Sequence, residues 1–201
     1  MEVTVSLADY GVGNLHSINK ALRNAGGDVR VVTDMRDLID SECIVFPGVG
    51  AFDRTMERLI PYRDDIRAVL GSGVPVLGIC IGMHILFDGS EEGGTEGLGL
   101  ISGRVKRLTA GQVPHMGWNS VDAEDEIFGG VDSRYFYFAH SYFGSPEDRS
   151  LVIGTTEHGG AEIPVLFRKK NVYGCQFHPE KSGLSGGRFI RNFIEFAKER
   201  Q

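Results

Sequence analysis

Cys80 stands between two glycines in the segment Gly78-Ile79-Cys80-Ile81-Gly82, where an apolar run ends. A Gly-x-nucleophile-x-Gly pattern between a strand and a helix is typical of a nucleophile elbow, in which a tight turn exposes a reactive side chain. The flanking glycines let backbone approach closely, and the start of a following helix favours a thiolate. The segment predicts a nucleophilic thiol, with the N–H of Ile81 as an oxyanion donor. A buried structural cysteine is the alternative for this pattern alone.

A nucleophilic thiol needs a general base, and His178 is the strongest candidate among six histidines. It precedes Pro179, which favours an extended backbone at residue 178, and residues two apart in extended chain point to the same side. We therefore expect His178 and Glu180 to face one site, where the carboxylate orients the imidazole in a Cys-His-Glu triad. Taken alone, a His-x-Glu motif is more often a strand-end histidine beside a solvated glutamate.

A glycine-containing segment, Phe46-Pro47-Gly48-Val49-Gly50, follows another strand-like run. Backbone N–H groups of such a loop can point toward a developing oxyanion, which makes Val49 and Gly50 candidate donors beside Ile81. An ordinary turn is the alternative. The loop, the elbow and the downstream His-x-Glu motif together supply the roles that acyl transfer from one thiol requires.

Strand-like and helix-like segments alternate through the first half of the chain. The predicted strands cover residues 3–7, 28–34, 43–50 and 74–80. The predicted helices cover residues 14–26, with Asn14 as the cap and Gly26 at the end, and residues 53–73, with an interruption at Pro61. This alternation predicts an α/β fold with a mainly parallel, open, twisted sheet flanked by helices.

The second half of the chain has a different pattern. Strand-like runs with turn signals between them indicate antiparallel additions to the sheet, at residues 101–108, 135–143, 150–156, 163–169 and 172–178. An amphipathic helix over residues 187–200 closes the chain. No linker or repeat separates the two halves, so residues 1–201 are expected to form a single domain.

Composition excludes several classes of function. A formal net charge of −6 and a pI near 5.5 argue against a nucleic-acid-binding surface. The sequence has no signal peptide and no apolar run of about 18 residues, so we expect a cytoplasmic protein without a membrane anchor. Three scattered cysteines, without a Cys-x-x-Cys pair, indicate neither a disulfide framework nor a zinc site.

The three motifs together resemble the class I, triad-type glutamine amidotransferases, which hydrolyse the side-chain amide of glutamine. The stretches ADYGVGNLHS, PGVGAFD, PHMGWN and FHPEKSG narrow the resemblance to members that pass ammonia to a (β/α)8-barrel synthase subunit in histidine biosynthesis. The resemblance implies that Cys80 is the nucleophile, His178 the base and acid, and Glu180 its orienting partner. It implies glutamine as substrate, a heterodimer in which the partner is the barrel protein, and no metal or organic cofactor.

The same resemblance implies further site residues. The glutamine pocket would be lined by Gly48, His84, Glu92 and Tyr142, and the contact with the barrel subunit would lie near Trp118, Asn119, Tyr137 and Lys181. Relatives usually carry glutamine at the position of His84. A histidine there, four residues after Cys80, lies on the same helix face and can donate a hydrogen bond to substrate, with a charge that depends on pH.

Four other interpretations fit parts of the sequence. An α/β-hydrolase-type cysteine hydrolase shares the elbow, but its acid usually precedes the histidine, whereas Glu180 follows His178. A glutaminase for pyridoxal phosphate synthesis would share the triad without PHMGWN. A dinucleotide-binding module is indicated by Gly11-Val12-Gly13, although His16 stands where a third glycine is expected. A regulatory pseudo-enzyme is disfavoured because all three triad positions are filled.

Overall fold

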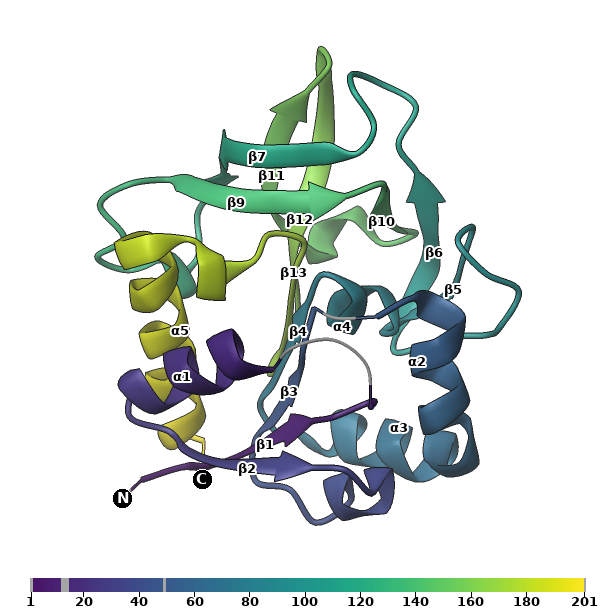
Figure 1. The fold of residues 1–201 in the computed structure, drawn as a ribbon, viewed down its shortest axis with the longest axis vertical. Coiled ribbons are helices and arrows are strands. Elements are labelled where there is room, and N and C mark those ends of the chain that lie inside the picture. The colour runs from purple at the N-terminus through teal and green to yellow at the C-terminus, as the bar shows by residue number, and fades with distance from the viewer. Residues whose placement is uncertain (1, 12–14, 49, 201) are drawn as a thin grey trace.

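The computed structural model describes residues 2–11, 15–48 and 50–200. Its centre is a sheet of eight strands in the order β2-β1-β3-β4-β13-β12-β11-β8 (Figure 1). The parallel part consists of β1 (Thr4–Ala8), β2 (Asp28–Val32), β3 (Ile44–Phe46), β4 (Val76–Ile79) and β13 (Val172–Cys175). The antiparallel part consists of β8 (Asp122–Ala123), β11 (Val152–His158) and β12 (Ala161–Lys169). The predicted mixed sheet, parallel in its first half, is confirmed.

Two smaller sheets complete the strand structure. One contains β5 (Phe87–Ser90), β6 (Ile101–Arg107) and β10 (Tyr142–Pro146). The other is an antiparallel ribbon of β7 (His115–Ser120) and β9 (Tyr135–His140), which crosses the upper end of the molecule in Figure 1. The motif PHMGWN forms most of β7, a strand that the sequence analysis did not predict.

Helices cover both faces of the large sheet. On one face, α1 (His16–Asn24) and α5 (Gly183–Lys198) share a core with Val5 and Leu7 of β1. On the other face, α2 (Phe52–Leu59) and α3 (Arg63–Ser72) share a core with Ala8, Ile44 and Phe46. The short helix α4 (Ile81–His84) follows β4 directly. Single 3₁₀ turns are η1 (Met35–Leu38), η2 (Ile60–Tyr62), η3 (Glu126–Phe128), η4 (Arg149–Leu151) and η5 (Pro179–Lys181).

Two helix boundaries test the sequence analysis. The interruption at Pro61 is confirmed, because η2 separates α2 from α3 there. The last helix begins at Gly183, four residues before its predicted start at Gly187. Gly186 permits this early start, since a Cβ on it would overlap the carbonyl of Pro179. Asn14, the predicted cap of the first helix, lies outside the described residues. Within the described residues no helix is long and apolar enough to cross a membrane.

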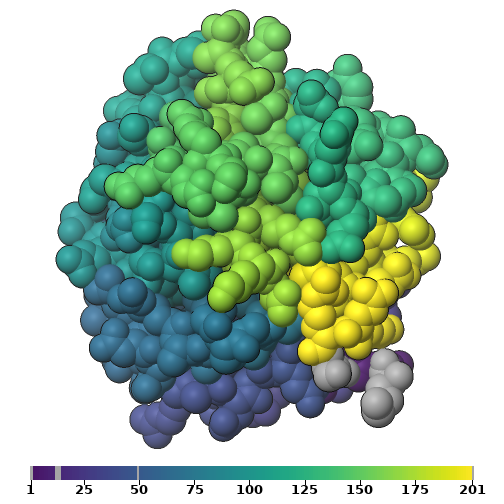
Figure 2. Space-filling view, turned by 180° about the vertical axis from the view of Figure 1, so that it is seen from behind, coloured from purple at the N-terminus to yellow at the C-terminus, as the bar shows by residue number. Residues whose placement is uncertain are grey.

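An aromatic cluster fixes the ribbon against the last helix. The rings of Phe136 and Phe177 lie 4.4 Å apart between centroids, and Phe189 of α5 lies 5.2 Å from Phe177. Seen from behind, α5 (yellow) lies directly below the teal and green segment that contains the ribbon (Figure 2). Large buried aromatic rings hold their neighbours tightly, so the cluster fixes the segment that leads from β13 to His178.

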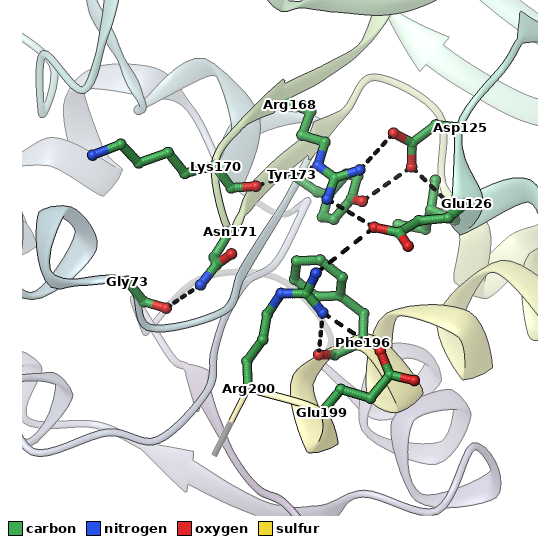
Figure 3. Close-up of polar contacts among 11 residues, drawn as sticks. Gly73, Asp125, Glu126, Arg168, Lys170, Asn171, Tyr173, Phe196, Glu199 and Arg200 are labelled. Atoms are coloured by element: carbon green, nitrogen blue, oxygen red, sulfur yellow. Dashed lines mark hydrogen bonds and ion pairs between the residues drawn. The ribbon is translucent and has the colours of Figure 1, made fainter.

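A polar cluster anchors the β12–β13 hairpin close to its turn (Figure 3). Arg168 forms ion pairs with Asp125 at 2.8 Å and with Glu126 at 2.7 Å, and the hydroxyl of Tyr173 donates to Asp125 at 3.0 Å. The guanidinium also lies over the rings of Tyr173 and Phe196. Paired and stacked in this way, Arg168 ties β12 and β13 to η3 and α5.

Candidate active site

Cys80 occupies the sharp turn between β4 and α4. Its φ of 49° and ψ of −108° are unusual for a residue with a side chain. The turn is held on both sides: the N–H of Cys80 donates to the Cys175 carbonyl at 2.7 Å, and the N–H groups of Met83 and His84 donate to the Cys80 carbonyl at 3.0 and 2.9 Å. The elbow geometry expected from the sequence is therefore present.

The flanking glycines permit this turn by close backbone approach. A Cβ on Gly78 would overlap the carbonyl of Gly82, and a Cβ on Gly82 would overlap the carbonyl of Phe46 in β3. The two positions are therefore closed to any larger residue without movement of the backbone around Cys80.

The Gly82→Ala substitution is expected to destabilise the protein, because the methyl group has no space. Overpacking of this kind costs roughly 1–3 kcal/mol, which corresponds to a fall in Tm of about 2–12 °C for a chain of this size. Gly187→Ala is the matched control, since its Cβ would meet nothing within 4 Å on α5. Thermal unfolding followed by circular dichroism compares the two variants, and equal Tm values would contradict the packing argument.

His178 and Glu180 lie beside the thiol. The Nδ1–H of His178 donates to Oε1 of Glu180 at 2.9 Å, and both side chains are buried. A Cβ placed on Gly48 would lie 2.8 Å from Cε1 of His178 and 3.1 Å from Cβ of Cys80, which shows how closely the imidazole approaches the thiol. The structure therefore brings the three side chains of the expected triad together at one place.

Backbone contacts hold His178 in this position. Its N–H donates to the carbonyl of Tyr137 in β9 at 2.8 Å, and its carbonyl accepts from the hydroxyl of Ser182 at 2.7 Å. The same hydroxyl accepts from the N–H of Tyr137 at 2.9 Å. Ser182 therefore joins the histidine to the ribbon, a role that the sequence analysis did not assign.

The protonated form of His178 is favoured. Burial lowers the pKa of its imidazole, but hydrogen bonds and charges of Cys80 and Glu180 outweigh this and raise the pKa to about 9. Because this pKa lies above the ordinary value near 6.5, the imidazolium stabilises the fold fully below about pH 6.5. That contribution is lost as the pH rises through about 9.

If an amide is hydrolysed at this site, the alkaline limb of the kcat profile is expected near pH 9. The departing amine needs a proton, and the imidazolium that supplies it persists up to that pH. Steady-state kinetics between pH 6 and 10.5 measures the limb, and Glu180→Gln should move it to lower pH by removing the carboxylate charge. A limb near pH 7 in the unmodified protein would show that the pair with Cys80 and Glu180 does not hold the proton.

A cavity of about 240 Å³ opens at the thiol, a size suited to a ligand no larger than an amino acid. Besides Cys80 and His178, its lining includes six expected site residues, Gly48, Gly50, Ile81, His84, Glu92 and Tyr142. Val49, the remaining oxyanion candidate, lies outside the described residues. A larger hollow of about 590 Å³ lies between α1 and α5, but Glu180 is the only triad residue at its edge.

His84 makes a different contact from the one that the sequence analysis expected. Its Nε2–H donates to Oε1 of Gln176 at 2.9 Å, and Nε2 of Gln176 lies 3.5 Å from the sulfur of Cys80. Burial lowers the pKa of His84 to about 4, so the ring is neutral at pH 7. Gln176 had no predicted role, because the strand predicted over residues 172–178 ends at Cys175, and the bend that follows brings the amide of Gln176 to His84 and Cys80.

Three of the four expected interface residues lie together beside the triad, where Trp118 and Lys181 are exposed and Tyr137 is half-buried. Trp118 and Tyr137 face each other across β7 and β9 with ring centroids 6.2 Å apart, and the ammonium of Lys181 lies 6.0 Å from the Tyr137 ring. Trp118 is 57% exposed, and Met116 on the same side of β7 is 65% exposed. Asn119 points to the opposite side, where its amide donates to the Glu157 carbonyl at 2.7 Å.

The fold is shared with solved structures that include a glutamine amidotransferase. A "crystal structure of glutamine amidotransferase" superposes with a TM-score of 0.73 at 21% identity, over 98% of this chain and 99% of that one. The structure of PurLQS from Thermotoga maritima gives a TM-score of 0.72 at 19% identity, over 99% of each of the two chains.

Sequence comparison gives the family. The model of the class I glutamine amidotransferases matches residues 6–196, and the chain belongs to this family. Among its relatives is imidazole glycerol phosphate synthase subunit HisH of Natronomonas pharaonis, 42% identical over 98% of this chain and 96% of that protein. The HisH subunit of Halobacterium salinarum is 43% identical over 98% of this chain and 94% of that protein.

The dinucleotide-binding interpretation depended on Gly11-Val12-Gly13. Of these residues, Val12 and Gly13 lie outside the part of the chain that the structure describes.

Proposed function

We propose that this chain is the glutaminase subunit of an imidazole glycerol phosphate synthase. It hydrolyses glutamine to glutamate and ammonia with Cys80, His178 and Glu180, and passes the ammonia to a (β/α)8-barrel subunit in histidine biosynthesis. The observation that carries the proposal is the meeting of thiol and imidazole at one small cavity, with the Glu180 carboxylate bound to that imidazole, in a chain about two-fifths identical to HisH subunits along nearly its whole length.

The first half of the reaction forms a thioester. The Cys80 thiolate attacks the carboxamide carbon of glutamine, and a C–S bond forms as the carbonyl oxygen gains negative charge. His178 then gives its Nε2 proton to the nitrogen, the C–N bond breaks and ammonia leaves. Glu180 holds Nδ1 and thereby directs Nε2 toward the reacting atoms.

The second half releases glutamate. Neutral His178 takes a proton from water, whose oxygen attacks the thioester carbon, and the C–S bond breaks to restore the thiolate and the imidazolium. In both halves the oxyanion needs backbone donors, for which Ile81, Gly50 and Val49 are the candidates. We expect slow hydrolysis in the isolated chain and faster hydrolysis in the complex, because binding of the barrel protein would turn a peptide of the 48–50 loop and so supply the oxyanion donor.

Recognition of glutamine requires a group for its charged α-ammonium. Glu92 is the carboxylate in the cavity lining outside the triad, which suits the α-ammonium group of glutamine. Burial raises the pKa of Glu92, and the charge of a bound ammonium would offset that effect. Tyr142 and His84 line the same cavity.

The proposed location is the cytoplasm. The buried free thiols of Cys43 and Cys175 fit its reducing environment.

The test is an assay of glutamate and ammonia release with the chain alone and with a co-expressed barrel subunit. Faster glutamate release in the complex, together with glutamine-dependent formation of the synthase product, is the expected result. A chain that releases glutamate without binding the barrel would be a glutaminase of another pathway. A complex that releases no glutamate would refute the proposed activity.

The Trp118→Ala substitution is expected to weaken binding of the barrel subunit by at least tenfold. Exposed tryptophans at the centre of an interface commonly contribute this much, and the surface around Trp118 adjoins the triad. Isothermal titration measures the Kd. Ile60→Ala is the matched control, because Ile60 is an exposed apolar residue at η2. Equal losses, or none at Trp118, would place the partner elsewhere.

A further inference from the structure

Three histidines gather at one wall of the glutamine cavity, and one of them, His140, is part of its lining. His115 begins β7, His140 ends β9 and His158 ends β11. His115 and His140 are each 5% exposed, and the rings of His115 and His158 stack with centroids 4.1 Å apart. None of the three belongs to the proposed triad. Buried polar rings of this kind need hydrogen-bond partners, and those partners indicate their role.

A chain of hydrogen bonds runs through two of the rings. Nδ1 of His115 lies 3.0 Å from Nε2 of His140, and Nδ1 of His140 lies 2.8 Å from the carbonyl oxygen of Tyr142. At the other end, Nδ2 of Asn119 lies 3.2 Å from Nε2 of His115. The chain therefore joins the amide of Asn119 to the backbone of Tyr142 through two imidazoles.

The Tyr142 end dictates the direction of every bond. A carbonyl oxygen only accepts, so Nδ1 of His140 carries the proton, and in a neutral ring Nε2 is then an acceptor. His115 must therefore donate from its own Nδ1, which leaves its Nε2 as an acceptor.

The Asn119 end independently requires the same direction. The amide Nδ2 of Asn119 donates to the Glu157 carbonyl at 2.7 Å, and its Oδ1 accepts from the N–H of Ser120 at 2.8 Å. These two backbone partners fix the orientation of the amide, so the group that faces His115 is a donor. Both ends agree only if His115 and His140 are neutral and carry their protons on Nδ1.

The surroundings keep both rings neutral. Burial lowers the pKa of His115 to about 4 and that of His140 to about 3. The titratable groups that act on His140 are His84, His115 and His158, all of which disfavour a further positive charge.

The chain of hydrogen bonds ends at a wall of the cavity. Residues 139–142 run from the end of β9 through Ser141 to the first residue of β10, and each of them lines the cavity. The carbonyl of Ser141 accepts from the N–H of Leu108 at 2.9 Å, which fixes one peptide of this wall. The bond from His140 fixes the next carbonyl, that of Tyr142.

We propose that His140 and His115 are positioning residues of the glutamine pocket. As neutral Nδ1–H tautomers they hold the Tyr142 carbonyl and thereby shape the cavity wall for the substrate amino acid. This inference rests on the proposed glutaminase function and adds to it a group of residues outside the triad. The chain of hydrogen bonds through His115 and His140 does not include Cys80, His178 or Glu180. Loss of these hydrogen bonds should therefore weaken glutamine binding more than it slows the chemical steps.

Kinetics of the complex with the barrel subunit tests the proposal. His140→Leu, which removes the donor to the Tyr142 carbonyl, is expected to raise KM for glutamine about tenfold while kcat changes less than about threefold. His140→Asn places an amide donor near the position of Nδ1 and is expected to restore KM to within about threefold. His158→Phe is the control. The phenyl ring can keep the stacking on His115, and the hydrogen bond that is lost, between Nε2 of His158 and the Gln112 carbonyl, is not part of the chain of hydrogen bonds through His115 and His140.

The outcomes separate this proposal from the proposed function. If the unmodified complex releases no glutamate, the proposed function fails. If it is active but His140→Leu leaves KM unchanged, or His140→Asn fails as badly as His140→Leu, the positioning role is refuted. Nitrogen-15 NMR of the folded protein at pH 7 tests the chain without any substrate: both histidines are expected as Nδ1–H tautomers, and an Nε2–H tautomer at either would overturn the proposal.

Discussion

Replacement of Cys80 by alanine is expected to lower kcat/KM for glutamine hydrolysis by at least about 10⁴-fold. The thiolate is the only group in the proposed mechanism that forms a covalent bond to substrate, and loss of a nucleophile removes the whole covalent route. The complex of the Cys80→Ala variant should still form synthase product from added ammonium salt, because the barrel subunit then receives ammonia directly. Glutamate release and ammonium-dependent product formation measure the two activities separately.

The other two cysteines supply matched controls for this experiment. Cys43 and Cys175 are fully buried, and burial raises the pKa of both thiols. Cys43→Ala is therefore expected to keep glutaminase activity within about threefold of the unmodified protein. Loss of activity in Cys43→Ala with survival in Cys80→Ala would contradict the assignment of the nucleophile.

The second large effect is expected at His178 and Glu180. His178→Gln removes the group that protonates the departing amine, and we expect kcat to fall by about 10³–10⁴-fold. Glu180→Gln leaves the imidazole in place but weakens the bond that directs it, so a fall of about 10²–10⁴-fold is expected. Single-turnover kinetics with glutamine shows whether the thioester step itself has slowed.

The double variant provides the control for cooperation within this pair. Because Glu180 acts through His178, the substitution of both should cost little more than His178→Gln alone. Fully additive losses would mean that the carboxylate acts independently of the imidazole. Near-normal folding of all three variants by circular dichroism is required for the comparison.

The elements around the thiol were predictable because their signals are local. Gly78 and Gly82 mark the tight turn at Cys80 within five residues. His178 is extended, as Pro179 predicts, but Pro179–Lys181 form the 3₁₀ turn η5, so this turn and not a continuous extended backbone brings Glu180 to the imidazole. The parallel half of the sheet was predictable for the same reason, since strand and helix patterns alternate within short windows.

Features that depend on contacts between distant segments were not predictable. His115 and His140 are 25 residues apart, and only the pairing of β7 with β9 brings their rings together. Gln176 and His84 meet across 92 residues. The early start of α5 depends on the close contact of Gly186 with the carbonyl of Pro179. The sequence alone does not show this contact, and glycines without it indicate a loop.

In the proposed reaction Cys80 is the one thiol that attacks the carboxamide of glutamine. Mass spectrometry of the complex after reaction with a diazoketone analogue of glutamine, which alkylates a nucleophile in the glutamine site, tests this role. One adduct per chain is expected, on the peptide that contains Cys80, together with protection by excess glutamine. An adduct on Cys43 or Cys175 with Cys80 unmodified would contradict this role.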